Sequence, residues 1–375
     1  MINRTIEDHI RQRLFSRKAI IVLGPRQSGK TTILKRLEQA HQNDALYFNC
    51  DETDIRAQLS NQNLSILKSL IGENKLILID EAQRVDNIGL TIKIMVDNLP
   101  MVQIVASGSS AFELSDRVNE PLTGRKWEFH LYPFSFEELA KHSDTMEEIK
   151  HLLPRLIYGS YPEIVNNPGK ERDVLTNLSS SYLYKDIFSL YDIRKPELIE
   201  QLLMALSLQI CSEVSYHELA QLLSSDPATI ERYILILERA YIVFRLINYS
   251  TNQRNEIKKS RKIYFIDNGI RNALISDFRQ IDLRDDIGKL WENYIVSELH
   301  KFRSNYNSIA KPYFWRSVGS GEIDFLELEN AQLTAYEIKW NPQKRARTRS
   351  FNNLYPNAKV NLINRENYFT YLVGQ

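Results

Sequence analysis

The sequence predicts an α/β protein that is divided into two or three domains. Five short apolar segments, separated by helical patterns, lie within the first 131 residues of the chain. This alternation is typical of a mostly parallel sheet with right-handed crossovers and a ligand site at the carboxyl edge of its strands. Near the carboxyl end, one helical segment precedes three further strand candidates. The chain has 375 residues, 43% of them hydrophobic, which is enough to bury more than one core.

The first strand candidate, 19–23, leads into the loop Gly24-Pro-Arg-Gln-Ser-Gly-Lys-Thr31 and then into a helical segment. In this arrangement backbone N–H groups and the helix dipole face a phosphate chain, and the glycines let the main chain come close. We expect Lys30 to reach the β- and γ-phosphates of a nucleotide, and the Thr31 hydroxyl to bind Mg²⁺. The residues expected to hold the nucleotide are Gly24, Pro25, Arg26, Gln27, Ser28, Gly29, Lys30, Thr31 and Thr32.

Composition excludes several classes of protein. The chain has no run of about eighteen apolar residues, and its charged start lacks a signal-peptide core, so we expect a soluble cytoplasmic protein without a membrane partner. The only cysteines, Cys50 and Cys211, lack neighbours at metal-ligand spacing, which favours buried thiols. Because the net charge is +1, any affinity for nucleic acid must be local. The basic runs at 254–262 and 339–349 are candidates, although such runs are usually solvated faces.

After a strand candidate at 46–49, the apolar run that starts at Lys75 ends in two acids, Asp80 and Glu81. A buried parallel strand would deliver both carboxylates beside the Mg²⁺-nucleotide. We expect Asp80 to hold the metal through water and Glu81 to polarise the attacking water. The alternative is that the two acids only mark the start of a loop.

Two further residues are candidates for the same site. The strand candidate 101–106 ends at Ser107, where a side chain could contact the γ-phosphate or the lytic water; the alternative is an ordinary turn. Arg125 precedes the strand candidate 127–131 and could stabilise charge on the nucleotide of a neighbouring subunit. The alternative for Arg125 is a plain surface arginine.

Helical patterns at 137–142, 146–158 and 171–190 complete a first domain, 1–190, as a lid. This layout resembles the AAA-type P-loop ATPases of bacteria and archaea, in particular a family with a Gly-Pro-Arg-Gln-x-Gly-Lys-Thr-Thr loop and with Asp-Glu-Ala-Gln and Gly-Ser-Ser segments. The resemblance implies ATP and Mg²⁺ as cofactors. A finger arginine that acts between subunits implies a homo-oligomer, and the resemblance implies a hexamer.

The middle segment, 191–266, predicts a winged helix. Helical patterns at 215–223 and 226–238 are joined by a tight turn, and a hairpin follows whose connecting loop carries the first basic run. In a DNA-binding protein the second of these helices would enter the major groove. Winged helices also serve as packing modules, and the exposed positions Thr229, Glu231 and Arg232 are a poor base-reading set. The residues expected to touch phosphates are Arg254, Lys258, Lys259 and Arg261.

The last segment, 267–375, places acids on adjacent strands. Asp324 and Glu337 interrupt the apolar alternation, and Lys339 shares a face with Glu337 because side chains repeat every two residues. Two carboxylates suit Mg²⁺, and a neighbouring lysine can position or deprotonate the water that attacks a phosphodiester. Glu292 or Glu298, on the preceding helix, could add a third carboxylate. The alternative is an ion pair in an inert sheet.

This constellation resembles the restriction-endonuclease-like superfamily, of which the archaeal Holliday-junction resolvases are a branch. The basic tail of Lys344, Arg345, Arg347 and Arg349 adds to that resemblance. The resembled ATPase family also carries a winged helix and such a nuclease-like module, so the resemblance covers essentially the whole chain.

The leading hypothesis is an ATP-hydrolysing protein that acts on branched or junction DNA and carries a metal-dependent nuclease domain. One alternative is a DNA motor whose nuclease fold is inactive. Another is an ATP-switched regulatory or defence protein whose later domains bind protein partners.

Overall fold

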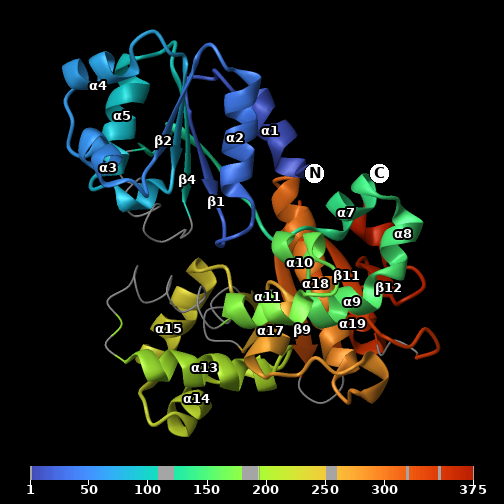
Figure 1. Ribbon diagram of the computed structural model, residues 1–375. Coiled ribbons are helices and arrows are strands. Elements are labelled where there is room, and N and C mark those ends of the chain that lie inside the picture. The colour runs from blue at the N-terminus through green and yellow to red at the C-terminus, as the bar shows by residue number, and fades with distance from the viewer. Residues whose placement is uncertain are drawn as a thin grey trace. The chain divides into compact units, whose positions relative to one another are not determined.

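The computed structural model describes residues 2–108, 122–179, 193, 195–250, 260–317, 321–344 and 348–374. These residues form two compact units, and the first unit runs to Pro133 and also takes in Arg239–Tyr241. The second unit comprises the other described residues from Phe134 onward. The ribbon in Figure 1 follows the chain from blue to red through both units. Within the described part of the chain, no helix is both long and apolar enough to cross a bilayer.

The first unit contains a five-stranded sheet, and all its strand pairings are parallel. The strands follow the order β2-β3-β4-β1-β5, so β4 separates β1 from β3. Every residue of β1, β3 and β4 is buried, as expected of strands that are covered on both faces. The predicted parallel sheet is thereby confirmed. Its strands are β1 (Ala19–Leu23), β2 (Ala45–Asn49), β3 (Leu76–Asp80), β4 (Gln103–Gly108) and β5 (Lys126–His130).

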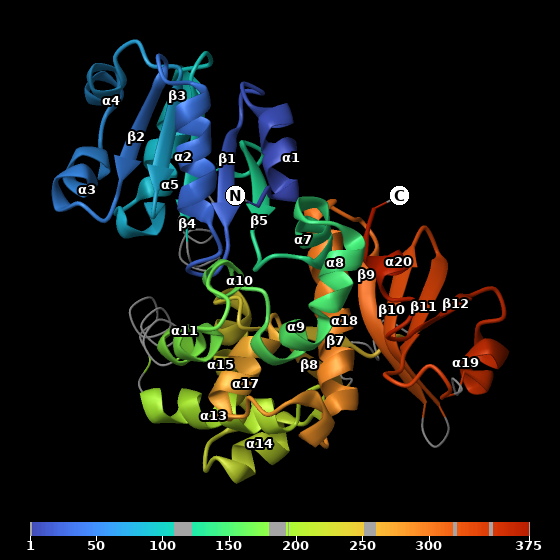
Figure 2. The same cartoon turned by 45° about the vertical axis from the view of Figure 1, so that its right-hand side comes forward.

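Helices connect these strands and cover the sheet (Figure 2). Ile6 and Ile10 of α1 and Ile33 and Leu34 of α2 belong to one buried cluster with apolar side chains of the strands. The two helices therefore pack on the same side of the sheet. Among the described residues, the helices of this unit are α1 (Thr5–Arg13), α2 (Lys30–Ala40), α3 (Thr53–Leu59), α4 (Leu64–Ile71), η1 (Ala82–Arg84) and α5 (Ile88–Asn98).

The helices that the sequence predicts as a lid of the first domain belong instead to the second unit. The Asn272 amide donates hydrogen bonds to the carbonyl oxygens of Leu156 (3.1 Å) and Ile157 (2.9 Å), and Asn268 also donates to Leu156. Buried side-chain amides of residues far along the chain thus hold these helices in the second unit. The expected domain boundary at residue 190 does not anticipate this arrangement. They are α7 (Phe136–His142), α8 (Thr145–Lys150), α9 (Leu152–Tyr158), α10 (Pro162–Asn166) and α11 (Glu171–Asn177); residues 180–190 lie outside the described residues.

In the described part of the middle segment, three helices accompany a three-stranded antiparallel sheet of order β6-β8-β7. The Ser215 side chain accepts a hydrogen bond from the Glu218 N–H, and Asp226 accepts one from Thr229, so both residues cap the helices they precede. The elements are α13 (Pro196–Leu208), β6 (Glu213–Val214), α14 (Tyr216–Leu222), α15 (Pro227–Arg239), β7 (Val243–Ile247) and β8 (Arg261–Phe265).

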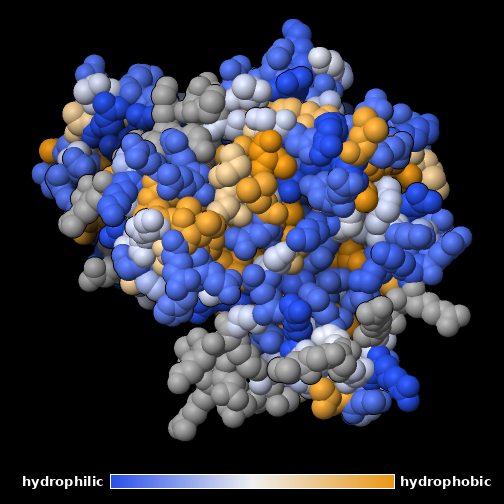
Figure 3. All heavy atoms as spheres, turned by 90° about the horizontal axis from the view of Figure 1, so that it is seen from below, coloured by the Kyte–Doolittle hydropathy of each residue, from blue (hydrophilic) through white to orange (hydrophobic). Residues whose placement is uncertain are grey.

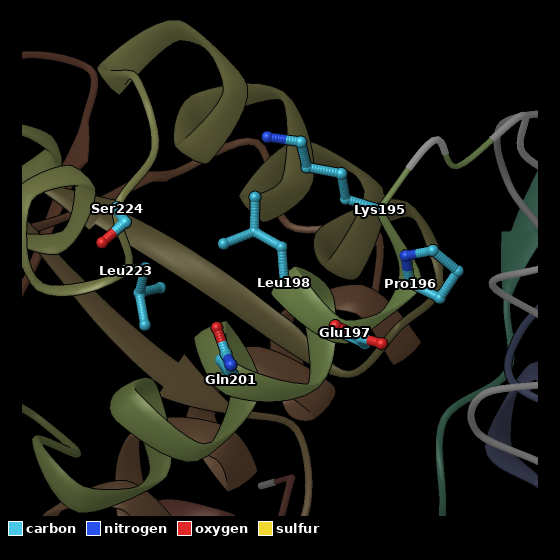
Figure 4. Close-up of a pocket in the computed structure, with 7 residues that line it drawn as sticks. All are labelled: Lys195, Pro196, Glu197, Leu198, Gln201, Leu223 and Ser224. Atoms are coloured by element: carbon cyan, nitrogen blue, oxygen red, sulfur yellow. The ribbon is translucent and has the colours of Figure 1, made fainter.

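A small cavity of about 340 Å³ lies between the start of α13 and the turn after α14. Figure 4 shows the seven residues that line it. Met204, Leu208 and Leu222, which lie nearby, are exposed. Figure 3, which views the side where α13 and α14 lie in Figure 1, shows hydrophobic side chains at the surface among hydrophilic ones.

The last segment is built on a four-stranded sheet of order β12-β11-β10-β9. β12 runs parallel to β11, and the other pairings are antiparallel. The register of β10 against β9 shifts between Ile323 and Leu326, so the pairing is irregular in the stretch that contains Asp324. Neither β12 nor α19 is predicted from the sequence. The elements are α17 (Asn268–Leu274), η3 (Ile281–Leu283), α18 (Ile287–Asn305), β9 (Lys311–Ser317), β10 (Gly321–Glu329), β11 (Gln332–Ile338), α19 (Arg349–Leu354), β12 (Lys359–Ile363) and α20 (Phe369–Leu372).

Candidate functional site

The loop between β1 and α2 needs its two glycines for different reasons. A Cβ at Gly24 would lie 2.1 Å from the carbonyl oxygen of Leu131, so no larger residue fits without a backbone shift. Gly29 has a φ of 101° and precedes the first residue of α2, Lys30. This left-handed conformation favours glycine. The loop therefore has the tight path that lets backbone N–H groups surround an anion at the start of α2.

Lys30 lies inside this loop. Its buried ammonium donates to the carbonyl oxygens of Gly24 (3.0 Å) and Pro25 (2.8 Å), and the Ser28 hydroxyl donates to the same Pro25 oxygen. The Gln27 side-chain oxygen is buried without a hydrogen-bond partner. A triphosphate fits this cradle, because its oxygens can accept from Lys30 in place of the loop carbonyls. Thr31 and Thr32 follow in the first turn of α2.

The Asp80 carboxylate, at the end of β3, is held from both neighbouring strands. Tyr47 on β2 donates to Oδ2 at 2.7 Å, and Ser107 on β4 donates to Oδ1, which also accepts from the Glu81 N–H. Burial, followed by the hydrogen bond to Asp80, raises the pKa of Tyr47 well above its ordinary range, so Tyr47 stays a donor. Ser107 thus lies beside Asp80, as a residue of the same site. Tyr47 is not anticipated from the sequence, because its role depends on β2 lying next to β3.

Glu81 leaves the strand in a left-handed conformation, with a φ of 53°. Its Oε2 accepts a hydrogen bond of 2.6 Å from the Gln83 amide. The Asp-Glu-Ala-Gln segment therefore gives its two acids different environments. Asp80 is buried and fixed by three donors, whereas Glu81 is half-buried and held only by this local contact among the bonds described here. This difference suits a metal-holding carboxylate beside a water-polarising one.

A residue from the amino-terminal segment supports the loop. The buried Arg4 guanidinium donates to the carbonyl oxygen of Ser28 at 3.1 Å and to that of Tyr132. Arg4 thereby ties the nucleotide loop to the chain that follows β5. No sequence signal indicates this role, because both acceptors are main-chain atoms of distant residues.

Arg125 lies at the amino-terminal ends of the strands, away from the nucleotide loop. Its carbonyl oxygen accepts from the N–H of Ala19, the first residue of β1, and its guanidinium pairs with Asp97 at 2.6 Å. The nucleotide loop leaves the opposite, carboxyl end of β1. The structure therefore does not bring Arg125 to the site of its own subunit, and a role at the site of a neighbouring subunit stays a prediction.

The predicted acids of the last segment come together at a second site. The Lys339 ammonium lies 2.7 Å from Glu337 Oε1 and 3.4 Å from Asp324 Oδ2, which also accepts from the Ile338 N–H. Glu292 of α18 lines the same cavity, whose volume is about 1180 Å³. We call Lys262, Glu292, Glu322, Asp324, Glu337 and Lys339 the carboxylate site.

Glu298 does not join the carboxylate site. Its Oε2 accepts from the Phe136 N–H at 2.6 Å, and its Oε1 accepts from Lys301 at 2.8 Å. It is absent from the lining of the cavity. Of the two helix acids offered by the sequence, the structure therefore brings Glu292, and not Glu298, to Asp324. The buried Glu298 instead anchors the start of α7.

Lys262 is the member of the carboxylate site that sequence reasoning misses. It stands in the first basic run, but its buried ammonium lies 3.0 Å from Glu292 Oε1, 3.9 Å from Asp324 Oδ1 and in contact with Glu322. Tyr264, two residues along β8, donates to the same Glu292 oxygen at 2.9 Å. The lysine therefore serves an internal cluster and not an exposed surface.

The donor chemistry of the carboxylate site fits a hard divalent cation. Its acidic oxygens are the ligands that Mg²⁺ prefers, and Glu337 Oε2 is buried without a hydrogen-bond partner. Burial raises the pKa of Glu292 against the opposing effect of Lys262, and burial together with Asp324 raises the pKa of Glu337. Ammonium groups separate the acids, and across the described residues no three His, Cys, Asp or Glu gather as ligands of one ion. A cation would therefore have to displace an ammonium.

Of the other basic residues that the sequence predicts to contact phosphates, some belong to the described part of the chain and others do not. Arg261 lies over the ring of Tyr216, with 4.4 Å from its guanidinium carbon to the ring centroid, and 4.0 Å from Glu231. Lys344 lines the cavity of the carboxylate site, and Arg349 begins α19. Arg254, Lys258, Lys259, Arg345 and Arg347 lie outside the described residues.

Comparison with known proteins gives a family match for the amino-terminal part of the chain. Residues 16–140 match the AAA domain family, so this part of the chain is similar to AAA domains. Residues 149–281 and 287–371 match two domains of unknown function, DUF8612 and DUF4143.

The similar curated proteins are described as uncharacterized proteins. One from Haemophilus influenzae is 23% identical, over 93% of this chain and 89% of its own length. One from Mycobacterium tuberculosis is 24% identical, over 88% of this chain and 72% of its own length.

Solved structures resemble this chain only distantly. An Aeropyrum pernix ORC1 protein in complex with DNA is 14% identical with a TM-score of 0.32, over 74% of this chain and 93% of that one. The Thermotoga maritima RuvB Holliday junction branch migration motor is 15% identical with a TM-score of 0.34, over 65% and 90%.

Proposed function

We propose that this protein hydrolyses ATP in its AAA domain and acts on DNA, with metal-dependent cleavage of phosphodiester bonds at the carboxylate site. The observation that carries the DNA-cleaving part is the convergence of Glu292, Asp324, Glu337 and Lys339 on one cavity. These residues come from a helix and two strands, as the predicted nuclease-like pattern requires.

The geometry of the nucleotide site supports ATP hydrolysis. Lys30 lies in the loop where it can pass its hydrogen bonds to the β- and γ-phosphates, and Thr31 follows at the start of α2. The Asp80 carboxylate, which accepts a hydrogen bond from Ser107, would bind a water ligand of the metal. Glu81 is the base that orients the attacking water. We assign ATP and Mg²⁺ as the cofactors of this site.

The second unit supports contact with DNA. Its order of helices and strands, with β8 between β6 and β7, favours a winged helix. Since the exposed side chains of α15 offer no good base-reading set, recognition would rest on backbone shape, and branched or junction DNA is the preferred substrate. Arg125 as an intersubunit finger would require a homo-oligomer, for which a hexameric ring is the arrangement we propose.

At the carboxylate site, Asp324, Glu337 and Glu292 would hold Mg²⁺, which activates water and offsets charge on the phosphate. Lys339 is placed to orient that water, because its ammonium already lies between Asp324 and Glu337. Lys344, at the rim of the cavity, is available to a phosphate of the strand.

The test is the ATPase rate with and without duplex, single-stranded and four-way-junction DNA. We expect stimulation, greatest with the junction, and loss of hydrolysis in Glu81→Gln. Nicking with Mg²⁺ or Mn²⁺ should disappear in Lys339→Ala and persist in Lys311→Ala, a matched exposed lysine of the same sheet. Nicking that survives Lys339→Ala would remove the nuclease and leave a DNA motor.

If none of the three DNAs changes the rate or binds at low salt, the DNA assignment is wrong and the ATP-switched, protein-binding alternative takes its place. Salt separates these alternatives. Phosphate contacts should weaken by about 0.9 log units of affinity per contact for each tenfold rise in salt, whereas a protein partner should show little of this dependence.

A further inference from the structure

Strand β8 contributes a positively charged side chain, Lys262, to the carboxylate site. Lys262 and Tyr264 point to the same side of β8 because side chains alternate along a strand. Both reach Glu292, and Lys262 also contacts Glu322 and lies 3.9 Å from Asp324 Oδ1. The site thus contains a lysine that the Asp…Glu-x-Lys pattern does not include.

The two lysines of the site differ in their freedom to move. The Lys262 side chain is only 3% exposed, and its strand is paired on one side with β6 and on the other with β7. The Lys339 side chain is 28% exposed and follows the end of β11. Lys339 therefore has room to shift within the open side of the site and stay beside an entering cation, whereas Lys262 is held in place.

The formal charges of the site do not cancel. The four carboxylates of Glu292, Glu322, Asp324 and Glu337 face the two ammonium groups of Lys262 and Lys339. When all are ionised, the formal charge is −2, which one divalent cation would neutralise. Without Lys262 the formal charge would be −3. Because Lys262 lies 3.0 Å from Glu292 Oε1 and 3.9 Å from Asp324 Oδ1, its charge would repel a divalent cation held by those oxygens. Its removal should change the affinity for that cation by more than a factor of ten, even at the effective dielectric of a protein.

We propose that Lys262 is a built-in counter-ion that limits the affinity of the carboxylate site for a divalent cation, while holding Glu292 and Asp324 in position. It is a positioning residue and does not itself touch the reacting atoms. This inference rests on the proposed metal-binding role of the site.

The test measures Mn²⁺ binding directly, by electron paramagnetic resonance of free Mn²⁺ with the full chain. An Asp80→Asn background excludes a signal from the nucleotide site. We expect Lys262→Met to bind Mn²⁺ at least tenfold more tightly than the parent. Lys262→Met combined with Glu322→Gln restores the formal charge of −2 and should return the affinity to within about threefold of the parent. Lys359→Met, an exposed change of the same charge on β12, should leave it unchanged.

Each outcome separates the inference from the proposed function. If the parent binds Mn²⁺ and Lys262→Met binds equally well, the counter-ion role is wrong and the metal site stands. If only Lys262→Met binds, the counter-ion role stands and the parent is no metal-dependent nuclease. If neither binds, both are wrong. Should Lys262→Met fail to fold, Glu322→Gln alone decides, because it lowers the charge to −1 and should weaken binding several-fold; unchanged affinity overturns the inference.

Discussion

Replacement of Arg4 by methionine is expected to loosen the nucleotide loop and weaken ATP binding. Arg4 is buried and donates to the main-chain oxygens of Ser28 and Tyr132. Methionine fills similar space but donates no hydrogen bond. Both carbonyl oxygens then lose a charged donor inside the protein. Because Ser28 belongs to the loop itself, the loss acts on the path of the main chain that surrounds the phosphates.

The size of the effect follows from the two contacts. Hydrogen bonds to a charged group each contribute about 1.5–3 kcal/mol, and the cost of leaving the buried acceptors unpaired is included in that range. We therefore expect Arg4→Met to lower the free energy of unfolding of the first unit by about 3 kcal/mol. The conservative Arg4→Lys keeps the positive charge but replaces the guanidinium N–H donors by one ammonium group. It should lower the free energy of unfolding by about half as much as Arg4→Met.

Urea unfolding and the Kd of a fluorescent ATP analogue measure the two consequences. We expect the Kd to rise by about tenfold, which corresponds to about 1.4 kcal/mol of the loss appearing in binding. Arg11→Met is the matched control, since Arg11 is exposed and pairs only with Glu7 one helical turn away among the contacts described; it should cost less than about 0.5 kcal/mol. An Arg4→Met protein with parental stability and parental Kd would refute a supporting role for Arg4.

Three further predictions concern single positions. Gly24→Ala should destabilise the first unit by about 3 kcal/mol in urea unfolding, because its Cβ would meet the Leu131 carbonyl at 2.1 Å; parental stability would show that the loop can shift. Glu298→Gln should cost about 3 kcal/mol by leaving Lys301 buried without its anion, yet should leave Mn²⁺ binding unchanged; weakened binding would return Glu298 to the metal site. The hydrogen bond to His130, together with that to Lys126, lowers the pKa of Glu128 from 4.5 to about 2, against the opposing effect of burial. The ionised Glu128 thus stabilises the fold fully above pH 4.5, and this stabilisation is lost as the pH falls toward 2. Glu128→Gln should therefore lower the free energy of unfolding by about 1 kcal/mol at pH 7 and reduce its fall between pH 4.5 and 2. An unchanged pH dependence in that range would contradict the prediction.

The sequence determined the parts of this protein that depend on neighbours along the chain. The glycine loop before Lys30 and the acids Asp80 and Glu81 at the end of a buried strand are local patterns, and a local pattern specifies local backbone geometry. The alternation of Asp324, Glu337 and Lys339 likewise specifies which side chains share a face. These patterns sufficed to anticipate the parallel sheet and to locate both candidate sites.

Only the tertiary structure decided which distant residues complete these sites. The placement of β2 and β4 beside β3 brings Tyr47 and Ser107 to Asp80, and the pairing of β8 within its own sheet brings Lys262 to Glu292. The same long-range packing sends Glu298 to α7. The physical reason is that a buried charge must find a partner in space, and strand order and helix docking, which no local motif specifies, decide which partner lies within reach.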